Sequence, residues 1–220
     1  MFFEEHAKLL SDFARVSQAA GARADYVQGG GGNTSVKLPG GLMAIKASGF
    51  CLSDIRPDKA YAVLDGADLR NFYLTTEPSA LADVEKEGSA RAKADIRHID
   101  GLADLRPSVE AGFHSILKTF VVHTHSVYAN LAACSTACRP IAAQAFAGAN
   151  YTWGWVPYTD PGANLTFAIR GELRRVEKET GKIPSVILMQ NHGIIVHDDD
   201  PDTALAIHTD ANERLARMFG

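Results

Sequence analysis

The chain has few cysteines and no disulfide pattern. Among its 220 residues only Cys51, Cys134 and Cys138 are cysteines, an odd number. This usage argues against a disulfide framework and is typical of a reducing compartment, so we expect a cytoplasmic protein. Cys134 and Cys138 lie four residues apart with no CxxC pair to complete a zinc knot. We interpret them as small apolar residues that fill a helix or turn.

Other absences exclude further classes of protein. No apolar run reaches the ~18 residues of a transmembrane helix, so we expect no membrane span. The start Met1-Phe2-Phe3-Glu4 lacks the basic residues and apolar stretch of a signal peptide. The formal net charge of -4 argues against a nucleic-acid partner, which needs a basic surface. A small anionic substrate remains compatible, because its binding depends on the local field of a pocket.

What is present indicates an ordinary globular core in a single domain over residues 1–220. Hydrophobic residues make up 46% of the chain and charged residues 22%, which is close to the globular average. Apolar patterns predict helices over 4–19, 163–179 and 201–218, with strands between them. Because strands and helices do not alternate strictly, we expect an α/β protein with one mixed sheet flanked by helices.

The segment Phe120-Val121-Val122-His123-Thr124-His125 is predicted to be a strand that ends in two histidines. Side chains alternate along a strand, so His123 and His125 project from the same face. Two imidazoles on one face can bind one metal ion, but zinc needs at least a third protein ligand. For this short pattern alone, two half-buried histidines are an equally good interpretation.

Polar groups and glycines gather at other strand ends. Four glycines at 29–32 precede Asn33 and Ser35, and Ser48-Gly49 follows a predicted strand at 42–47. Glycine permits positive φ and close approach of a ligand, and free N–H groups there can form an anion-binding nest. The alternative is a glycine-rich entry to a hairpin, which the glycines alone favour.

A helix is predicted to begin near Ser108, which follows a proline and precedes an apolar helical run. Glu110 would lie in the first turn, where the helix dipole favours a carboxylate. It is either a helix-start carboxylate or an acid/base beside a small anion held at the helix N-terminus. His114 follows one turn later.

The segment 186–197 is predicted to form two apolar strands joined by the bend Asn191-His192-Gly193. A polar residue between buried strands is costly without a partner, and metal coordination would satisfy His192. His197 and His208 could support the metal-binding residues from behind, but packing or surface roles are the preferred interpretation. The mixed charges of residues 77–104 indicate a solvated helix, with His98 on the surface.

Together these motifs resemble the class II aldolases of the aldolase/adducin family, which include fuculose- and rhamnulose-phosphate aldolases and ribulose-phosphate 4-epimerase. The resemblance extends from about residue 7 to about residue 218, and the order of the motifs is its specific feature. The Ser-Val-Glu form is similar to the aldolase half of aldolase/short-chain dehydrogenase fusions. The motifs are Gly32-Asn33-Thr34-Ser35, Lys46-Ala47-Ser48-Gly49, Pro107-Ser108-Val109-Glu110, His123-Thr124-His125 and Asn191-His192-Gly193.

The resemblance implies a single-domain, three-layer α/β/α fold with a central mixed, largely antiparallel sheet, usually in a homotetramer with active sites between subunits. It implies that His123, His125 and His192 bind Zn²⁺, with Mn²⁺, Co²⁺ and Fe²⁺ as alternatives, and that Glu110 is the catalytic acid/base. The implied phosphate-binding residues are Gly32, Asn33, Ser48, Gly49 and Ser108.

The implied reaction is cleavage of a ketose phosphate or related hydroxy-carbonyl compound to dihydroxyacetone phosphate and an aldehyde, through a metal-stabilised enediolate. An epimerase or a dehydratase could use the same site, whereas adducin-like interaction domains lack the three histidines. Val109 stands where phosphate-handling aldolases commonly have a second serine, which weakens the case for phosphate. Tyr128 and Tyr151 are candidates for the tyrosine proton donor that a neighbouring subunit often supplies in this family.

Overall fold

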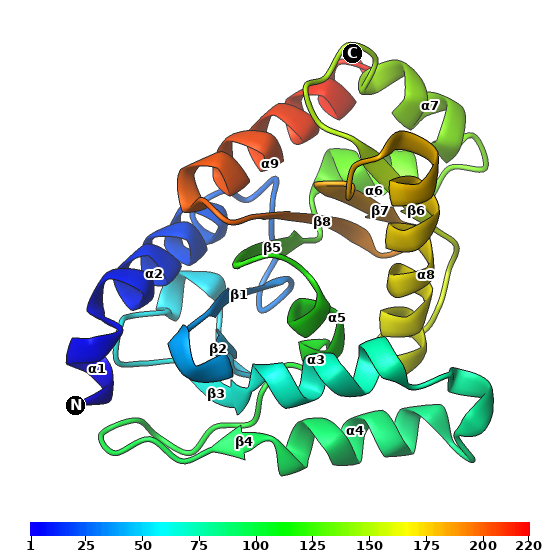
Figure 1. Ribbon diagram of the computed structural model, residues 1–220. Coiled ribbons are helices and arrows are strands. Elements are labelled where there is room, and N and C mark those ends of the chain that lie inside the picture. The colour runs from blue at the N-terminus through cyan, green and yellow to red at the C-terminus, as the bar shows by residue number, and fades with distance from the viewer.

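One eight-stranded sheet crosses the computed structural model, which describes all 220 residues (Figure 1). The strand order is β4-β3-β2-β1-β5-β8-β7-β6, and only β6 and β7 pair in parallel. The predicted mixed, largely antiparallel sheet is therefore confirmed. The strands are β1 (Asn33–Lys37), β2 (Leu42–Lys46), β3 (Tyr61–Asp65), β4 (Ile96–Arg97), β5 (Phe120–Thr124), β6 (Trp153–Val156), β7 (Val186–Met189) and β8 (Gly193–Asp198).

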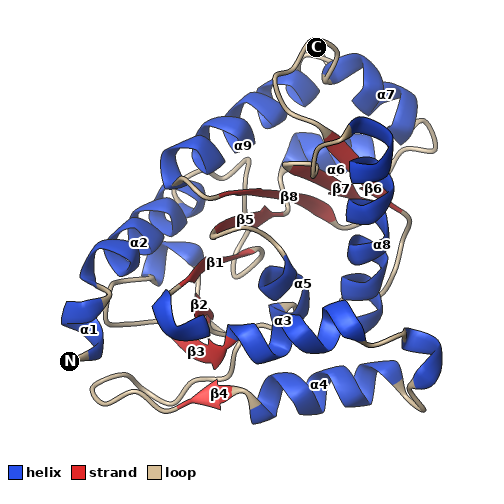
Figure 2. Ribbon diagram, in the orientation of Figure 1, coloured by secondary structure: helices blue, strands red, loops and turns tan.

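Helices cover both faces of the sheet, as Figures 1 and 2 show. The first face carries α2 (Ala7–Gly21), α6 (Val127–Ala133), α7 (Cys138–Ala145) and α9 (Pro201–Ala216), and the short α1 (Phe2–Glu5) precedes α2 in the chain. The other face carries α3 (Gly66–Thr75), α5 (Ala111–Ile116) and α8 (Ala163–Thr180), with α4 (Val84–Ala94) packed outside them. The chain thus forms the expected three layers. No helix combines the length and apolarity that a membrane span requires.

Alternation along the central strand β5 explains where the histidines point. Phe120 and Val122 are buried in the cluster that contains α2, whereas Val121 is buried with Phe113 of α5 on the opposite face. Because successive side chains point to opposite faces, His123 shares the α5 face with Val121, and Thr124 points towards α9. Burial on both faces also explains the continuous apolar run of this strand.

Several local predictions need correction. The predicted helix 4–19 is divided into α1 and α2 at His6 and continues to Gly21. The prediction that Cys134 is a packed filler is wrong, because this residue is exposed at the end of α6, whereas Cys138 is buried as predicted. The helix predicted to begin near Ser108 begins at Ala111.

Candidate metal and catalytic site

Three histidines meet at the end of β5. His123 and His125 come from β5 and the residue beyond it, and His192 comes from the turn between β7 and β8. The antiparallel pairing of Thr124 with Ile194 brings this turn beside His123. One nitrogen from each ring lies within 4.8 Å of the other two. This arrangement could hold one metal ion, since three imidazoles and an open position form a common zinc site.

The turn that carries His192 depends on an unusual backbone. Asn191 has a φ of 54°, in the left-handed region that asparagine tolerates better than most residues. A Cβ atom on Gly193 would collide with the Thr124 carbonyl oxygen. Only glycine therefore lets β8 pair so closely with β5 at the point where His192 enters the site.

Glu110 faces the histidines from the N-terminal end of α5. It is the residue before the helix, not part of its first turn, and its side chain makes no capping hydrogen bond. Oε1 lies 3.1 Å from His192 Nε2, and Oε2 lies 3.6 Å from His123 Nε2. The expected capping role of Ser108 is replaced by a local bond, because its Oγ accepts from the Glu110 N–H at 3.2 Å. The carboxylate is therefore directed into the histidine cluster.

The donor atoms of this cluster fit a bound cation. His123 Nδ1 donates to the Ile194 carbonyl at 3.0 Å, which leaves the lone pair on Nε2. That Nε2 is buried without a hydrogen bond, and Glu110 Oε1 is also unbonded despite its proximity to His192. Buried acceptors facing one another are costly unless a cation satisfies them. Imidazole nitrogen and carboxylate oxygen suit Zn²⁺ and other divalent first-row ions.

Burial also sets the protonation state that a metal requires. It lowers the pKa of His123 to about 3, and it lowers the pKa of His125 as well. Both rings are therefore neutral near pH 7. Burial raises the pKa of Glu110. Its contacts with His123, His192 and the amide of Asn33 lower the pKa by more, so the net pKa lies below its ordinary value. The structure therefore does not give Glu110 the raised pKa that would favour a general acid.

Beside the histidines lies an open pocket of about 300 Å³. Eight of the nine site residues predicted from the sequence line it, and His123 is buried behind them. The glycine run both leads into β1 and lines this pocket. The eight are Gly32, Asn33, Ser48, Gly49, Ser108, Glu110, His125 and His192.

Asn33 connects the proposed phosphate-binding residues to the carboxylate. Its Nδ2 donates to Ser108 Oγ at 3.1 Å and to Glu110 Oε2 at 2.5 Å. Its Oδ1 then accepts from His114 Nε2, so His114 Nδ1 accepts from the Ser35 hydroxyl at 2.7 Å. This chain of bonds fixes the Glu110 carboxylate in one orientation.

Sequence reasoning missed two contributors. Lys46 lines the pocket from the end of β2, and its buried ammonium donates to the Phe50 carbonyl at 2.7 Å. A lysine ending an otherwise apolar strand was the available signal. The role of His114 in the Asn33 network was also missed, because only the pairing of β1 with β5 and the packing of α5 bring it there.

The two candidate tyrosines do not line the pocket. The Tyr151 hydroxyl donates to Asp210 Oδ2 at 2.8 Å, so it is already engaged within the chain. Tyr128 lies partly buried on α6.

Comparison with known proteins gives a consistent result. A sequence model described as "Class II Aldolase and Adducin N-terminal domain" matches residues 11–219. No match was found among curated protein sequences.

Many solved structures are similar to the chain, and three of them illustrate the match. The N-terminal class II aldolase domain of a conserved protein from Thermoplasma acidophilum has a TM-score of 0.77 and 20% identity, covering 96% of this chain and 93% of that one. YgbL from Klebsiella pneumoniae is described as "a putative aldolase/epimerase/decarboxylase". It has a TM-score of 0.65 and 18% identity, and the match covers 97% of this chain and 89% of that one. L-Fuculose-1-phosphate aldolase from Thermus thermophilus has a TM-score of 0.57 and 15% identity, and the match covers 97% of this chain and 94% of that one. At these identities the likeness establishes the fold.

Proposed function

Because the chain belongs to the class II aldolase and adducin N-terminal domain family, we propose that it is a metal-dependent aldehyde-lyase. The proposed reaction cleaves a ketose phosphate or related hydroxy-carbonyl compound into dihydroxyacetone phosphate and an aldehyde. The observation that carries the proposal is the buried cluster of His123, His125 and His192 around Glu110, with unbonded lone pairs facing one another.

His123, His125 and His192 would hold the metal, which we propose to be Zn²⁺. Bound there, the ion would supply Lewis acidity that stabilises negative charge developing on substrate oxygens. The protein's own contribution is preorganisation, because the Nδ1 bond of His123 to Ile194 fixes the direction of its lone pair.

Glu110 is the proposed catalytic base. Its lowered pKa keeps it ionised at neutral pH, so it can accept a proton from a substrate hydroxyl and return it to the reacting carbon. The Asn33 amide holds Oε2, which limits the carboxylate to one position. Such orientation is worth more than basicity alone when the substrate is bound in a fixed geometry.

The anionic end of the substrate would lie against Gly32, Asn33, Ser48, Gly49 and Ser108. Val109 adds no hydroxyl there, but the Lys46 ammonium on the pocket wall supplies a positive charge. A cation and several polar donors around a small pocket suit a phosphate or carboxylate group, whose binding energy would orient the reacting carbons.

An epimerase or dehydratase is the second candidate function, since the same base and metal site could begin either reaction. The similar protein from Klebsiella pneumoniae is described as a putative aldolase, epimerase or decarboxylase. A non-catalytic adducin-like role is less well supported, because the three histidines are all present and clustered.

Glu110→Gln is the direct test of the proposed reaction. We expect turnover to fall by about 10²–10⁴-fold, the usual contribution of a general base, while bound metal is retained. Aldol cleavage is screened over ketose 1-phosphates and unphosphorylated ketoses with added Zn²⁺ or Mn²⁺. Metal is measured by elemental analysis of the same samples.

Glu213→Gln is the matched control, since Glu213 is exposed on α9 and makes no ion pair. It should leave turnover unchanged. Loss of metal in Glu110→Gln would instead make Glu110 mainly a ligand. Wild-type protein that holds less than stoichiometric metal after metal-replete purification would contradict the enzymatic proposal.

We also propose a homotetramer, following the family resemblance, in which a neighbouring subunit completes the site. The absence of a tyrosine from the pocket lining is compatible with such a contribution. The proposed cytoplasmic location is supported by the three free cysteines.

A further inference from the structure

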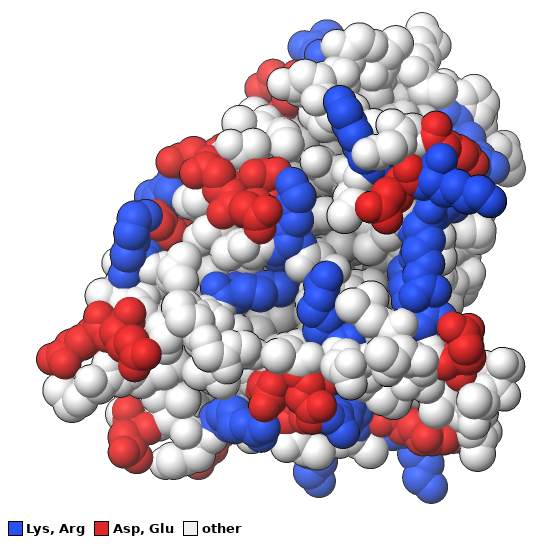
Figure 3. Space-filling model, viewed as in Figure 1, with Lys and Arg blue, Asp and Glu red and all other residues white.

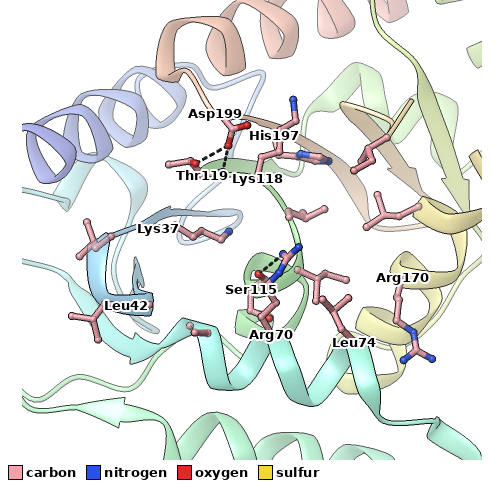
Figure 4. A pocket seen from close by; sticks show the side chains of 18 of the residues that line it. Lys37, Leu42, Arg70, Leu74, Ser115, Lys118, Thr119, Arg170, His197 and Asp199 are labelled. Atoms are coloured by element: carbon pink, nitrogen blue, oxygen red, sulfur yellow. Dashed lines mark hydrogen bonds between the residues drawn. The ribbon is translucent and has the colours of Figure 1, made fainter. Parts of the chain in front are cut away.

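A second cavity, of about 610 Å³, lies on the face of the sheet covered by α3, α5 and α8 (Figure 4). It shares no residue with the pocket beside the histidines. Lys37, at the end of β1, lines this cavity, whereas Asn33, at the start of the same strand, lines the histidine pocket. The two sites therefore lie at opposite ends of β1.

The cavity is strongly basic. Figure 3 shows several Lys and Arg side chains around a hollow near the centre of the molecular surface in this view. The cationic residues that line it are Lys37, Arg70, Lys118, Arg170 and Arg174, against the two carboxylates Glu177 and Asp199. This local excess contrasts with the net charge of -4 for the whole chain.

Three of these cations have no carboxylate partner. Lys37 Nζ donates to the His114 carbonyl, Arg70 Nη1 to the Ser115 carbonyl at 3.1 Å, and Arg174 Nη2 to the Leu74 carbonyl at 3.2 Å. Only Lys118 and Arg170 pair with acids, at 2.9 Å to Asp198 and 3.5 Å to Glu77. Guanidinium and ammonium groups that share a cavity with fewer carboxylates than cations repel one another.

His197 adds an unsatisfied polar group to the same wall. It is 1% exposed, and neither of its ring nitrogens makes a hydrogen bond. Burial and the nearby Lys37 and Lys118 lower the pKa of His197 to about 3. Burial, with Arg70 beside it, also holds the pKa of Lys37 well below its usual value. A bound anion would relieve both penalties.

We propose that this cavity is a binding site for a small phosphate or phosphate ester, distinct from the active site. The fork of an arginine matches the oxygens of a phosphate, and Lys37 provides a point charge on the opposite wall. The Thr119 and Ser115 side chains also line the cavity (Figure 4), and their hydroxyls donate to Asp199 Oδ1 at 2.7 Å and to the Gly112 carbonyl at 2.6 Å. Its volume lies within the range of small-molecule sites. The proposal does not depend on the reaction proposed above.

The test is calorimetric titration of inorganic phosphate into the metal-loaded protein at constant ionic strength. All proteins carry Ser48→Ala and Ser108→Ala, which remove hydroxyls from the proposed phosphate-binding end of the active site. In this background we expect saturable binding. Adding Arg70→Gln and Arg174→Gln should weaken it by about ten-fold or more, because two charge-assisted contacts are lost.

Arg139→Gln is the control for net charge, since Arg139 is exposed on α7 and does not line the cavity. It should change affinity by less than about two-fold, as expected of a screened surface charge. Arg174→Gln alone serves if the double substitution unfolds the protein, and it should still weaken binding measurably. Absence of phosphate binding in the background protein, equal binding after the cavity substitutions, or equal loss in Arg139→Gln would each overturn the proposal.

Discussion

At the scale of single residues, the buried histidines share one physical state. His114, His123, His197 and His208 are all almost fully buried, and burial lowers the pKa of each. Each ring is therefore neutral in the folded protein at pH 7. Their chemistry differs only through their neighbours: His123 faces Glu110, whereas His208 Nε2 bonds to the Thr124 hydroxyl at 2.7 Å. His208 is thus a packing residue, as expected from the sequence.

These lowered pKa values make the fold sensitive to acid. For His208 the folded-state pKa is about 4, below the ordinary value of 6.5. Between these values the unfolded chain binds a proton that the folded protein does not. The stability contributed by neutral His208 is therefore complete above pH 6.5 and is lost as pH falls towards 4.

His208→Gln should reduce this pH dependence, because the amide can still bond to Thr124 but cannot titrate. We expect the loss of unfolding free energy between pH 7 and pH 5 to be smaller than in the wild type by about 2 kcal/mol. Urea denaturation at both pH values measures the difference. His98→Gln is the control, since His98 is exposed and its substitution should not reduce the loss. An unchanged difference in His208→Gln would show that His208 does not contribute to acid sensitivity.

At the scale of elements, the charged segment 77–104 has a structural role that its composition did not reveal. Helix α4 is solvated as predicted, but Glu85 also accepts from the backbone N–H groups of Ala163 and Asn164 at 2.9 and 2.7 Å. These groups begin α8, whose N-cap position is Gly162 and offers no side chain. Glu85 therefore caps α8 from a distant part of the chain and places a negative charge at its N-terminus.

Glu85→Ala should lower the unfolding free energy by about 1–2 kcal/mol, the usual effect of removing a helix cap. Glu85→Gln, which keeps an acceptor but no charge, should lose less. Chemical denaturation of both variants measures the effect. Glu87→Ala is unsuitable as a control because Glu87 accepts from Ala82 and Asp83. Lys93→Ala on exposed α4 should change stability little, and an equal loss there would contradict the capping role.

Helix α5 is the element that connects the two pockets. Glu110 stands at its N-terminal end, and the carbonyls of His114 and Ser115 near its C-terminal end accept from Lys37 and Arg70. Helix α5 therefore lies between the proposed phosphate site and the proposed base.

At the scale of the whole molecule, the histidine cluster joins segments that are far apart in the chain. Glu110 precedes α5, His123 lies on β5 and His192 lies in the β7–β8 turn, and only the sheet order brings them together. A metal bound by His123, His125 and His192 would cross-link β5 and the β7–β8 turn in the folded state alone. Metal removal should therefore destabilise the entire fold.

Thermal unfolding with and without Zn²⁺ tests this expectation. At a free metal concentration about 100 times Kd, the ion should stabilise the protein by about 2.7 kcal/mol and raise Tm by about 5–10 °C. His125→Asn should lose most of this increase, because one ligand is removed from the cluster. His98→Asn, on the surface, should retain it. An equal increase in wild type and His125→Asn would indicate that the metal binds elsewhere.

Much of the fold and of the candidate site follows from local sequence. Alternation along residues 120–125 places His123 and His125 on one face, and Gly193 allows the close turn that presents His192. The direction of the two β5 histidines depends only on strand alternation, whereas the need for glycine at 193 arises from the pairing of β8 with β5. The Ser108 helix start was misplaced because a local bond to the Glu110 N–H could not be distinguished from a cap.

Only the tertiary structure decided the contacts between distant segments. The Asn33–Glu110 bond requires β1 to pair with β5 and α5 to pack beside them, and no local pattern specifies that pairing. The basic cavity likewise combines residues from 37 to 199, whose excess of cations over carboxylates becomes visible only after packing. Side-chain direction is a local property of a strand or helix, whereas strand order is set by the burial of the whole sheet.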